Sequence, residues 1–143
     1  MKKPQDIIFY AIDKSIKSYR QMGQSRLSEA GLDITIDQWL VLNVVREQPD
    51  ATQQLIASRI FKDNASVTRI IDLLVDKGYL KRSVLGSDRR KSSLLITAKG
   101  SKLLTAASEV VKNYRKLALG GISERDLAKA HEVLDKIIAN CDL

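Results

Sequence analysis

The spacing of hydrophobic residues predicts long helices at both ends of the chain. Between residues 4 and 29, apolar side chains recur every three or four positions, the period of an amphipathic helix, at Ile8, Ile12, Ile16 and Tyr19. Two further stripes of this kind follow residue 97. They comprise Leu103, Ala107, Val110, Tyr114 and Leu117, and then Leu127, Leu134, Ile137 and Ile138. We expect the last stripe, with His131 and Cys141 on the same helix, to face a core.

Shorter helices are predicted between these end segments, each introduced by a capping residue. Thr35 and Gln38 have the spacing of a capping box, which places a helix start at Thr35. Thr52 is suited to cap a short helix, and Asp63 or Asn64 is suited to cap the next one. The segment that follows residue 64 is the most informative of these.

This fourth helix separates an apolar face from a polar one. Its core-facing stripe comprises Val67, Ile70, Ile71, Leu74 and Val75. At about 100° per residue, Arg69 points almost directly away from that stripe, with Ala65 and Ser66 one turn earlier. The exposed N-terminal half is therefore small, polar and cationic, whereas Asp72 and Asp76 make the C-terminal half unsuited to phosphate.

After this helix the pattern changes from helical to extended. The segments YLKRSV and SSLLI flank a turn that contains Gly86, and together they predict a β-hairpin. Two short helices followed by a two-stranded hairpin form a winged helix-turn-helix, so we predict a mainly α fold with a β wing. The predicted boundaries are 1–30 and 101–143 for the flanking helices and 34–100 for the winged lobe, with a first helix (52–60), a recognition helix (64–77) and a wing (79–97).

Charge and chemistry narrow the function. Lys and Arg exceed Asp and Glu by 24 to 17 in this chain of 143 residues, a net charge of +7 that suggests a polyanionic partner, although solubility alone also accounts for it. The single cysteine excludes an intrachain disulfide, and Asp6 and Asp13 interrupt any signal peptide. No apolar run approaches the roughly 18 residues of a membrane span, so we expect a cytoplasmic protein without a membrane partner.

Catalytic and metal-binding patterns are missing from the sequence. His131 is the only histidine and Cys141 the only cysteine, and together they supply at most half of a metal site. No nucleotide-binding or nucleophile motif is present. We therefore expect no enzyme activity, no cofactor and no metal.

The polar face of the fourth helix suits DNA. Arg69 is able to donate two hydrogen bonds to guanine, and Ser66 and Thr68 are able to reach bases or phosphates. The alternative is a solvated helix face on which Arg69 pairs with Asp72.

Residues 52–100 resemble the DNA-binding core of the MarR family of winged-helix transcriptional regulators. The wing signature of that family is Asp-x-Arg followed after five residues by Leu-Thr and then a glycine. It occurs here as Asp88, Arg89 and Arg90, then Ile96 and Thr97, then Gly100. Isoleucine in place of leucine at 96 is the one departure, and the long flanking helices extend the resemblance over essentially the whole chain.

The resemblance implies a homodimer that binds double-stranded DNA at a pseudo-palindromic promoter site, acting as a ligand-responsive repressor. The N-terminal helix and the last two helices of such a dimer interlock, and the apolar stripes described above are the surfaces it would bury. Ordinary packing within one chain is the alternative role for those stripes.

The resemblance also assigns roles in DNA binding. Arg90 is implied to enter the minor groove, Asp88 to orient the wing arginine, and Arg89 and Lys91 to contact phosphates. Further phosphate contacts are implied at Lys62, at Asn64 and at the helix N-terminus capped by Thr52. Arg82 either contacts phosphate or braces the wing.

Many relatives release DNA when they bind a small phenolic or anionic aromatic effector. Tyr10, Tyr19 and Trp39 are candidates to line such a crevice, with a plain core role as the alternative. The leading alternative for the whole protein is a winged-helix protein-interaction module, against which the basic SDRRK turn and Arg69 both count.

Overall fold

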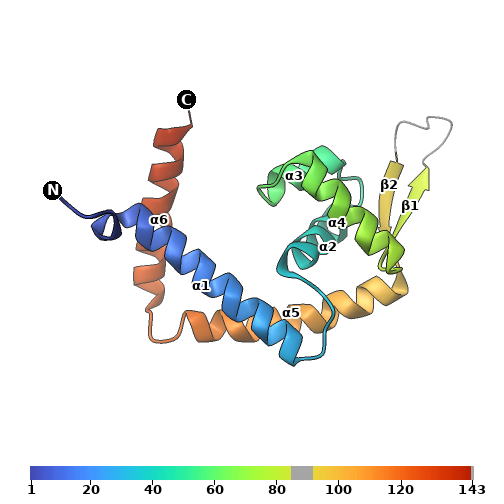
Figure 1. Ribbon diagram of the computed structural model, residues 1–143, viewed down its shortest axis with the longest axis horizontal. Helices are drawn as coiled ribbons and strands as arrows, with labels where there is room; N and C mark the ends of the chain where they lie inside the picture. Colours follow the sequence, from blue (N-terminus) through green and yellow to red (C-terminus); the bar gives the residue numbers. More distant parts are fainter. Residues whose placement is uncertain (85–91, 143) are drawn as a thin grey trace.

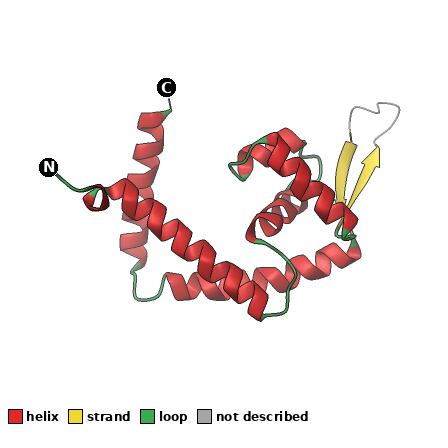
Figure 2. Cartoon of the chain, viewed as in Figure 1, coloured by secondary structure: helices red, strands yellow, loops and turns green. Residues whose placement is uncertain are grey.

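A computed structural model describes residues 1–84 and 92–142 of the chain. Helices dominate it, and the described strands form one small antiparallel sheet beside them (Figures 1 and 2). The elements are η1 (Pro4–Asp6), α1 (Ile8–Glu29), α2 (Ile36–Glu47), α3 (Gln53–Arg59), α4 (Asn64–Asp76), β1 (Leu80–Val84), β2 (Ser92–Ile96), α5 (Ala98–Ala118) and α6 (Glu124–Cys141). The predicted mainly α fold with a winged helix-turn-helix is confirmed.

The predicted caps start the predicted helices. Thr35 Oγ1 accepts the Gln38 N–H at 3.1 Å, and Gln38 Oε1 accepts the Thr35 N–H at 3.1 Å, so the capping box is complete. Thr52 Oγ1 accepts from the N–H of Leu55 at 3.1 Å. Of the two candidates before α4, it is Asp63 that forms the cap.

The core of the lobe lies among α2, α3, α4 and the base of the wing, on the right in Figure 1. Val67, Ile71 and Leu74 of α4 are fully buried, which confirms the stripe predicted for this helix. Residues Val41, Leu42 and Ile56 of α2 and α3 are buried with them. The opposite face of α4 is thereby fixed toward the outside.

The buried face of α5 agrees only in part with the prediction. Of the predicted residues, Ala107 and Tyr114 are buried and Leu103 and Val110 are partly buried, whereas Leu117 is 60% exposed. Leu104 and Val111, which the prediction left out, are also buried. Apolar residues occupy two neighbouring lines on this helix, and the sequence alone does not show which one meets the core. Packing against α1 and α2 selects the line that begins at Gly100.

Helices α1 and α5 cross at a close contact. The rings of Tyr19 and Tyr114 stack with centroids 5.2 Å apart and planes inclined by 14°. A Cβ at Gly23 would lie 2.6 Å from the Tyr114 ring, so glycine is required for this approach. Burial raises the pKa of Tyr114 to about 12, which keeps its phenol neutral. This contact joins the flanking helices to each other.

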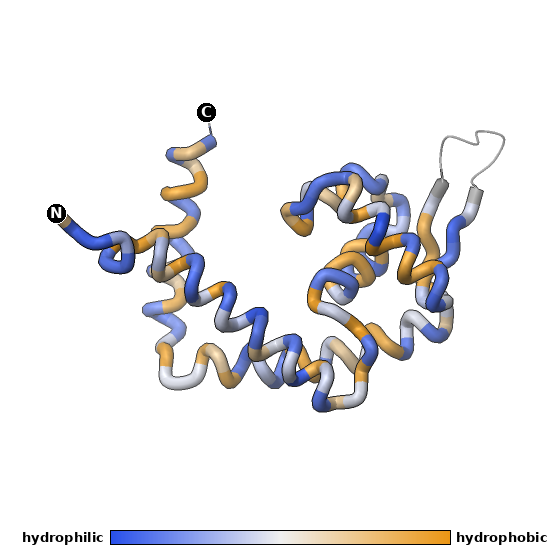
Figure 3. Tube along the Cα trace, in the orientation of Figure 1, coloured by the Kyte–Doolittle hydropathy of each residue, from blue (hydrophilic) through white to orange (hydrophobic). Residues whose placement is uncertain are grey.

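The α6 stripe does not enter the core of its own chain, so packing within one chain, the alternative role for these stripes, is wrong for this helix. No residue of α6 is buried, and Ile138 is 64% exposed. Figure 1 shows α6 rising from the end of α5, and Figure 3 shows apolar positions along it. His131 is exposed, and its Nδ1 lies 3.2 Å from Oδ2 of Asp135. Cys141 is also exposed. A strong helical pattern predicts an apolar face but not what covers it.

Candidate nucleic-acid interface

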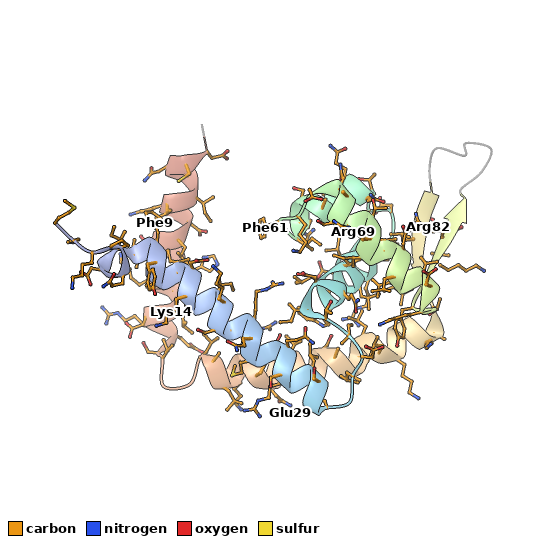
Figure 4. All side chains as sticks on the ribbon, in the orientation of Figure 1. Phe9, Lys14, Glu29, Phe61, Arg69 and Arg82 are labelled. Carbon is orange, nitrogen blue, oxygen red and sulfur yellow. The ribbon has the colours of Figure 1, made fainter. Side chains whose placement is uncertain are left out.

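The turn between α3 and α4 sets the direction of α4. The N–H of Lys62 donates to the carbonyl of Ala57 at 3.0 Å, and the N–H of Phe61 donates to the carbonyl of Ser58 at 3.4 Å. This pattern is a Schellman motif, whose left-handed position favours glycine. Phe61 occupies that position with a φ of 59° and is 94% exposed, at the edge of the lobe that faces α1 (Figure 4).

The N-terminal half of α4 presents an exposed polar surface. Asn64, Ala65 and Arg69 are exposed, and Ser66 is half-buried. The Ser66 N–H donates to Asp63 Oδ1 at 2.7 Å and lowers the pKa of that carboxyl below its usual range, with the charge of Arg69 acting in the same direction. The cap carboxylate therefore stays charged and offsets part of the positive charge of Arg69.

Thr68 faces α3 rather than solvent. Its hydroxyl donates to the Asn64 carbonyl at 2.8 Å and accepts a hydrogen bond from Nε2 of Gln53. Gln53 also donates to the Asn64 carbonyl, at 3.4 Å. The structure thus places Thr68 in a bridge between the two helices of the helix-turn-helix.

Arg82 joins the wing to α4. The guanidinium of Arg82, on β1, forms an ion pair with the carboxylate of Asp72, on α4 (Figure 4 labels Arg82). This contact is the bracing alternative for Arg82. It also means that Asp72, the predicted alternative partner of Arg69, is paired with a different arginine.

The base of the wing is a regular antiparallel pair. Leu80 pairs with Ile96 and Arg82 pairs with Leu94, and the side chains of Leu80 and Leu94 are buried. Ile96 is half-buried against the core, which is compatible with leucine or isoleucine. The predicted wing-tip residues Asp88, Arg89, Arg90 and Lys91 lie outside the described residues.

Thr97 and Gly100 close the wing against α5. Thr97 Oγ1 accepts the Gly100 N–H at 3.0 Å and donates to the carbonyl of Gly78 at 2.6 Å. The Tyr79 carbonyl lies so close to Gly100 that a Cβ there would overlap with it. The wing signature of the sequence therefore includes a packing requirement at its last position.

Lys62 is held in a bridge of charges. Its Nζ lies 3.3 Å from Oδ2 of Asp37, whose Oδ1 accepts a hydrogen bond from Arg20 of α1. The two cations come from segments far apart in the sequence. Sequence reasoning missed Asp37, because nothing in its local pattern distinguishes it from an ordinary first-turn acid.

The candidate effector residues do not share one site. A pocket of about 440 Å³ lies between α2, the end of α3 and α5, and Trp39 lines it, but Tyr10 and Tyr19 do not. Trp39 Nε1 donates to Ser108 Oγ at 3.2 Å. The other charged and polar lining residues are Asn43, Arg46, Glu47, Arg59 and Arg115. Tyr10 is exposed, and Tyr19 is in the stack with Tyr114.

The part of the chain that the structure describes contains neither a metal-binding cluster nor a membrane-spanning helix. Across residues 1–84 and 92–142, no cluster of three or more His, Cys, Asp or Glu side chains is arranged to hold a metal ion. None of the helices in the same ranges combines the length and apolar character that a membrane span requires.

Comparison with known proteins identifies the resemblance. Residues 31–91 match the model of the MarR family. The transcriptional regulator PA3341 is 26% identical, with 95% of this chain and 98% of that chain covered and a TM-score of 0.81.

The fold is shared by two structures with lower sequence identity. BpsR of Bordetella bronchiseptica, whose DNA binding is regulated by 6-hydroxynicotinic acid, is 18% identical over 96% of both chains, with a TM-score of 0.85. MepR of S. aureus, solved with DNA, is 20% identical over 98% of this chain and 100% of that one, with a TM-score of 0.84. The MarR-family resemblance predicted from the sequence is confirmed.

Proposed function

With the MarR-family match as premise, we propose that the protein is a transcriptional regulator that binds a pseudo-palindromic promoter site as a homodimer and is released by a small ligand. The observation that carries this proposal is the orientation of α4. Its apolar stripe is buried, and its exposed N-terminal half presents Arg69. Recognition helices of this class meet base edges with their N-terminal residues.

Roles for individual residues follow from their positions. Arg69 is proposed to reach a guanine, and Asn64, Ala65 and Ser66 to lie against the DNA backbone or base edges. Thr68 of α4 is proposed to hold this surface in place through its hydrogen bond with Gln53 of α3. The N-terminus of α3, at Thr52, is proposed to face a phosphate. For the wing, Arg90 is proposed as the minor-groove residue, oriented by Asp88, with Arg89 and Lys91 at phosphates.

The proposed dimer accounts for apolar surface that one chain leaves uncovered. Phe9 and Ile16 of α1 are 56% and 48% exposed, and on α6 Leu134 and Ile138 are exposed while Leu127 and Ile137 are half-buried. Exposed apolar surface of this extent marks a contact with another molecule. A second copy fits because each protomer then supplies one recognition helix to a symmetric DNA site.

The proposed effector is a small anionic aromatic compound that binds the Trp39 pocket. Arg46 and Arg115 supply positive charge, Arg59 is paired with Glu47 of the same lining at 3.1 Å, and Trp39 supplies an aromatic wall. The pocket touches both α3 and α5. A ligand there therefore contacts the helix-turn-helix and a flanking helix at once, which gives it a route to change their relative position.

Replacing Arg69 by alanine is expected to weaken DNA binding by about 1–3 kcal/mol and to relax selectivity at one base pair. Arg90→Ala is expected to cause a loss of the same size, and Lys91→Ala a smaller, sequence-independent one. Gel-shift titrations at fixed salt, with duplexes of different sequence, measure the affinity and the selectivity of each variant. Asp76→Asn, on the acidic end of α4, is the control. Wild-type affinity for Arg69→Ala and Arg90→Ala would remove both residues from the interface.

Effector binding is expected to depend on Arg115. We expect at least one compound in a panel of aromatic carboxylates, with 6-hydroxynicotinic acid included, to release the protein from DNA. Arg115→Gln should raise the concentration needed by about tenfold, since a charge-assisted hydrogen bond contributes about 1.5–3 kcal/mol. DNA affinity without ligand should stay unchanged. Equal release of wild type and variant would place the ligand elsewhere.

The same premise sets two further expectations. Proteins of the matched family regulate transcription, so we propose that this chain has no catalytic activity and works in the cytoplasm, where its DNA is. A winged-helix protein-interaction module remains the alternative function. That alternative predicts no loss of function on neutralising Arg69.

A further inference from the structure

Asp37 occupies a junction between the flanking helices and the helix-turn-helix. It lies in the first turn of α2, and its carboxylate is shared by Arg20 of α1 and Lys62 of the turn before α4. The side chains of Asp37, Arg20 and Lys62 are 27%, 39% and 35% exposed, so this bridge is partly withdrawn from solvent. Ion pairs of this kind are screened less than fully exposed ones.

The bridge is anchored at its α1 end. Four residues after Arg20, Gln24 Nε2 donates to the Ile34 carbonyl at 3.1 Å, and Gln24 Oε1 accepts the Ile36 N–H at 3.3 Å. The same stretch of α1 packs on α5 through Gly23 and Tyr114. Contacts thus run without a break from α5 through α1 to the start of α2.

At its other end the bridge holds a strained turn. Lys62 directly follows Phe61, which has a left-handed backbone, and directly precedes Asp63, the cap of α4. A non-glycine residue in this conformation is strained and persists only where its surroundings fix it. The ion pair to Asp37 is made by the residue next to Phe61, and it directs the Lys62 ammonium toward α2.

We propose that Asp37 is a positioning residue, which ties the start of the recognition helix to α1 and keeps Lys62 from contacting DNA phosphate. This inference rests on the proposed function, because it concerns selectivity at the same DNA interface. It gives Lys62 a different role from the phosphate contact that the family resemblance implies. The two roles lead to opposite expectations for substitutions.

The test uses the full-length protein, a duplex that the wild type selects from a random-sequence pool, and a shuffled duplex of equal composition. Asp37→Asn is expected to lower the ratio of the two affinities by about tenfold, a size typical of coupling between sites. It should also steepen the salt dependence by about one ion, because the freed Lys62 reaches a phosphate. Asp37→Glu should restore both values toward wild type.

Two variants separate the parts of the proposal. Arg20→Gln breaks the tie to α1 but leaves Lys62 paired, so it should lower the affinity ratio without changing the salt dependence. Lys62→Gln should leave the wild-type salt dependence unchanged. Asp33→Asn, which removes an exposed acid paired with Lys77, is the matched control and should change neither value.

Several results would overturn the proposal. Asp37→Asn that folds, as judged by thermal unfolding, and keeps the wild-type ratio would show a merely structural ion pair. If Asp37→Asn does not fold, an unchanged ratio in Arg20→Gln has the same meaning. A salt dependence that falls by one ion in Lys62→Gln would place Lys62 on phosphate. Failure of the wild type to select any sequence would instead refute the proposed function itself.

Discussion

Replacing Ile138 by glutamate is expected to convert the protein from a dimer to a monomer and to weaken binding to its DNA site by about 100-fold or more. Ile138 is 64% exposed on α6, where no side chain is buried within the chain, so the folding of one protomer should not depend on it. A charge at the centre of a subunit interface is costly to bury. Once the protomers separate, the two half-sites no longer bind as one unit, and the gain from linked binding is lost.

The measurement is sedimentation equilibrium for the oligomeric state, with a DNA titration on the same samples. Ala139→Glu is the control, because it adds the same charge at an exposed position of α6 that is about 100° or more around the helix from every residue of the apolar stripe. A dimer that persists in Ile138→Glu would show that α6 is not part of the subunit interface. A monomer with unchanged DNA affinity would show that dimerisation is not needed for binding.

Replacing Gly100 by alanine is expected to destabilise the fold by about 3 kcal/mol or more. A Cβ at this position overlaps with the carbonyl of Tyr79, and that carbonyl already accepts the N–H of Thr97 at 3.1 Å. A flexible side chain would move aside, but here backbone meets backbone at the joint of the wing and α5. The first turn of α5 or the backbone directly before β1 must therefore shift, and overpacking of this kind costs about 1–3 kcal/mol even where side chains adjust.

Urea unfolding of both proteins measures the change. The control is Gly31→Ala, because Gly31 has a φ of 75° but no neighbouring atom within 4 Å of the place a Cβ would take, so only backbone strain of about 1 kcal/mol is expected. Equal losses for the two variants would mean that strain, and not contact with Tyr79, explains the glycine at position 100.

Local signals in the sequence predicted the fold well. The Thr35 capping box, the cap at Thr52 and the buried stripe of α4 all depend on residues within one or two turns of each other, and each appears in the structure. The lobe could be recognised because its short helices and hairpin follow one another directly along the chain.

The features that the sequence did not predict share a physical cause, because each depends on contacts between segments far apart in the chain. The phase of the α5 stripe depends on where α1 crosses it, at Gly23. The α6 helix has no buried residue, and its own pattern of apolar residues does not predict this. Asp37 has no local signal, because its two partners lie 17 and 25 residues away in the sequence.

The central claim is that this chain reads a symmetric DNA sequence as a dimer. Selection from a random duplex pool, followed by titration of the selected duplex at two salt concentrations, tests it most directly. We expect an enriched motif with two-fold symmetry, two protomers bound per duplex, and an affinity that falls steeply as salt rises. Enrichment of no motif, together with no salt-sensitive binding to duplex DNA, would contradict it.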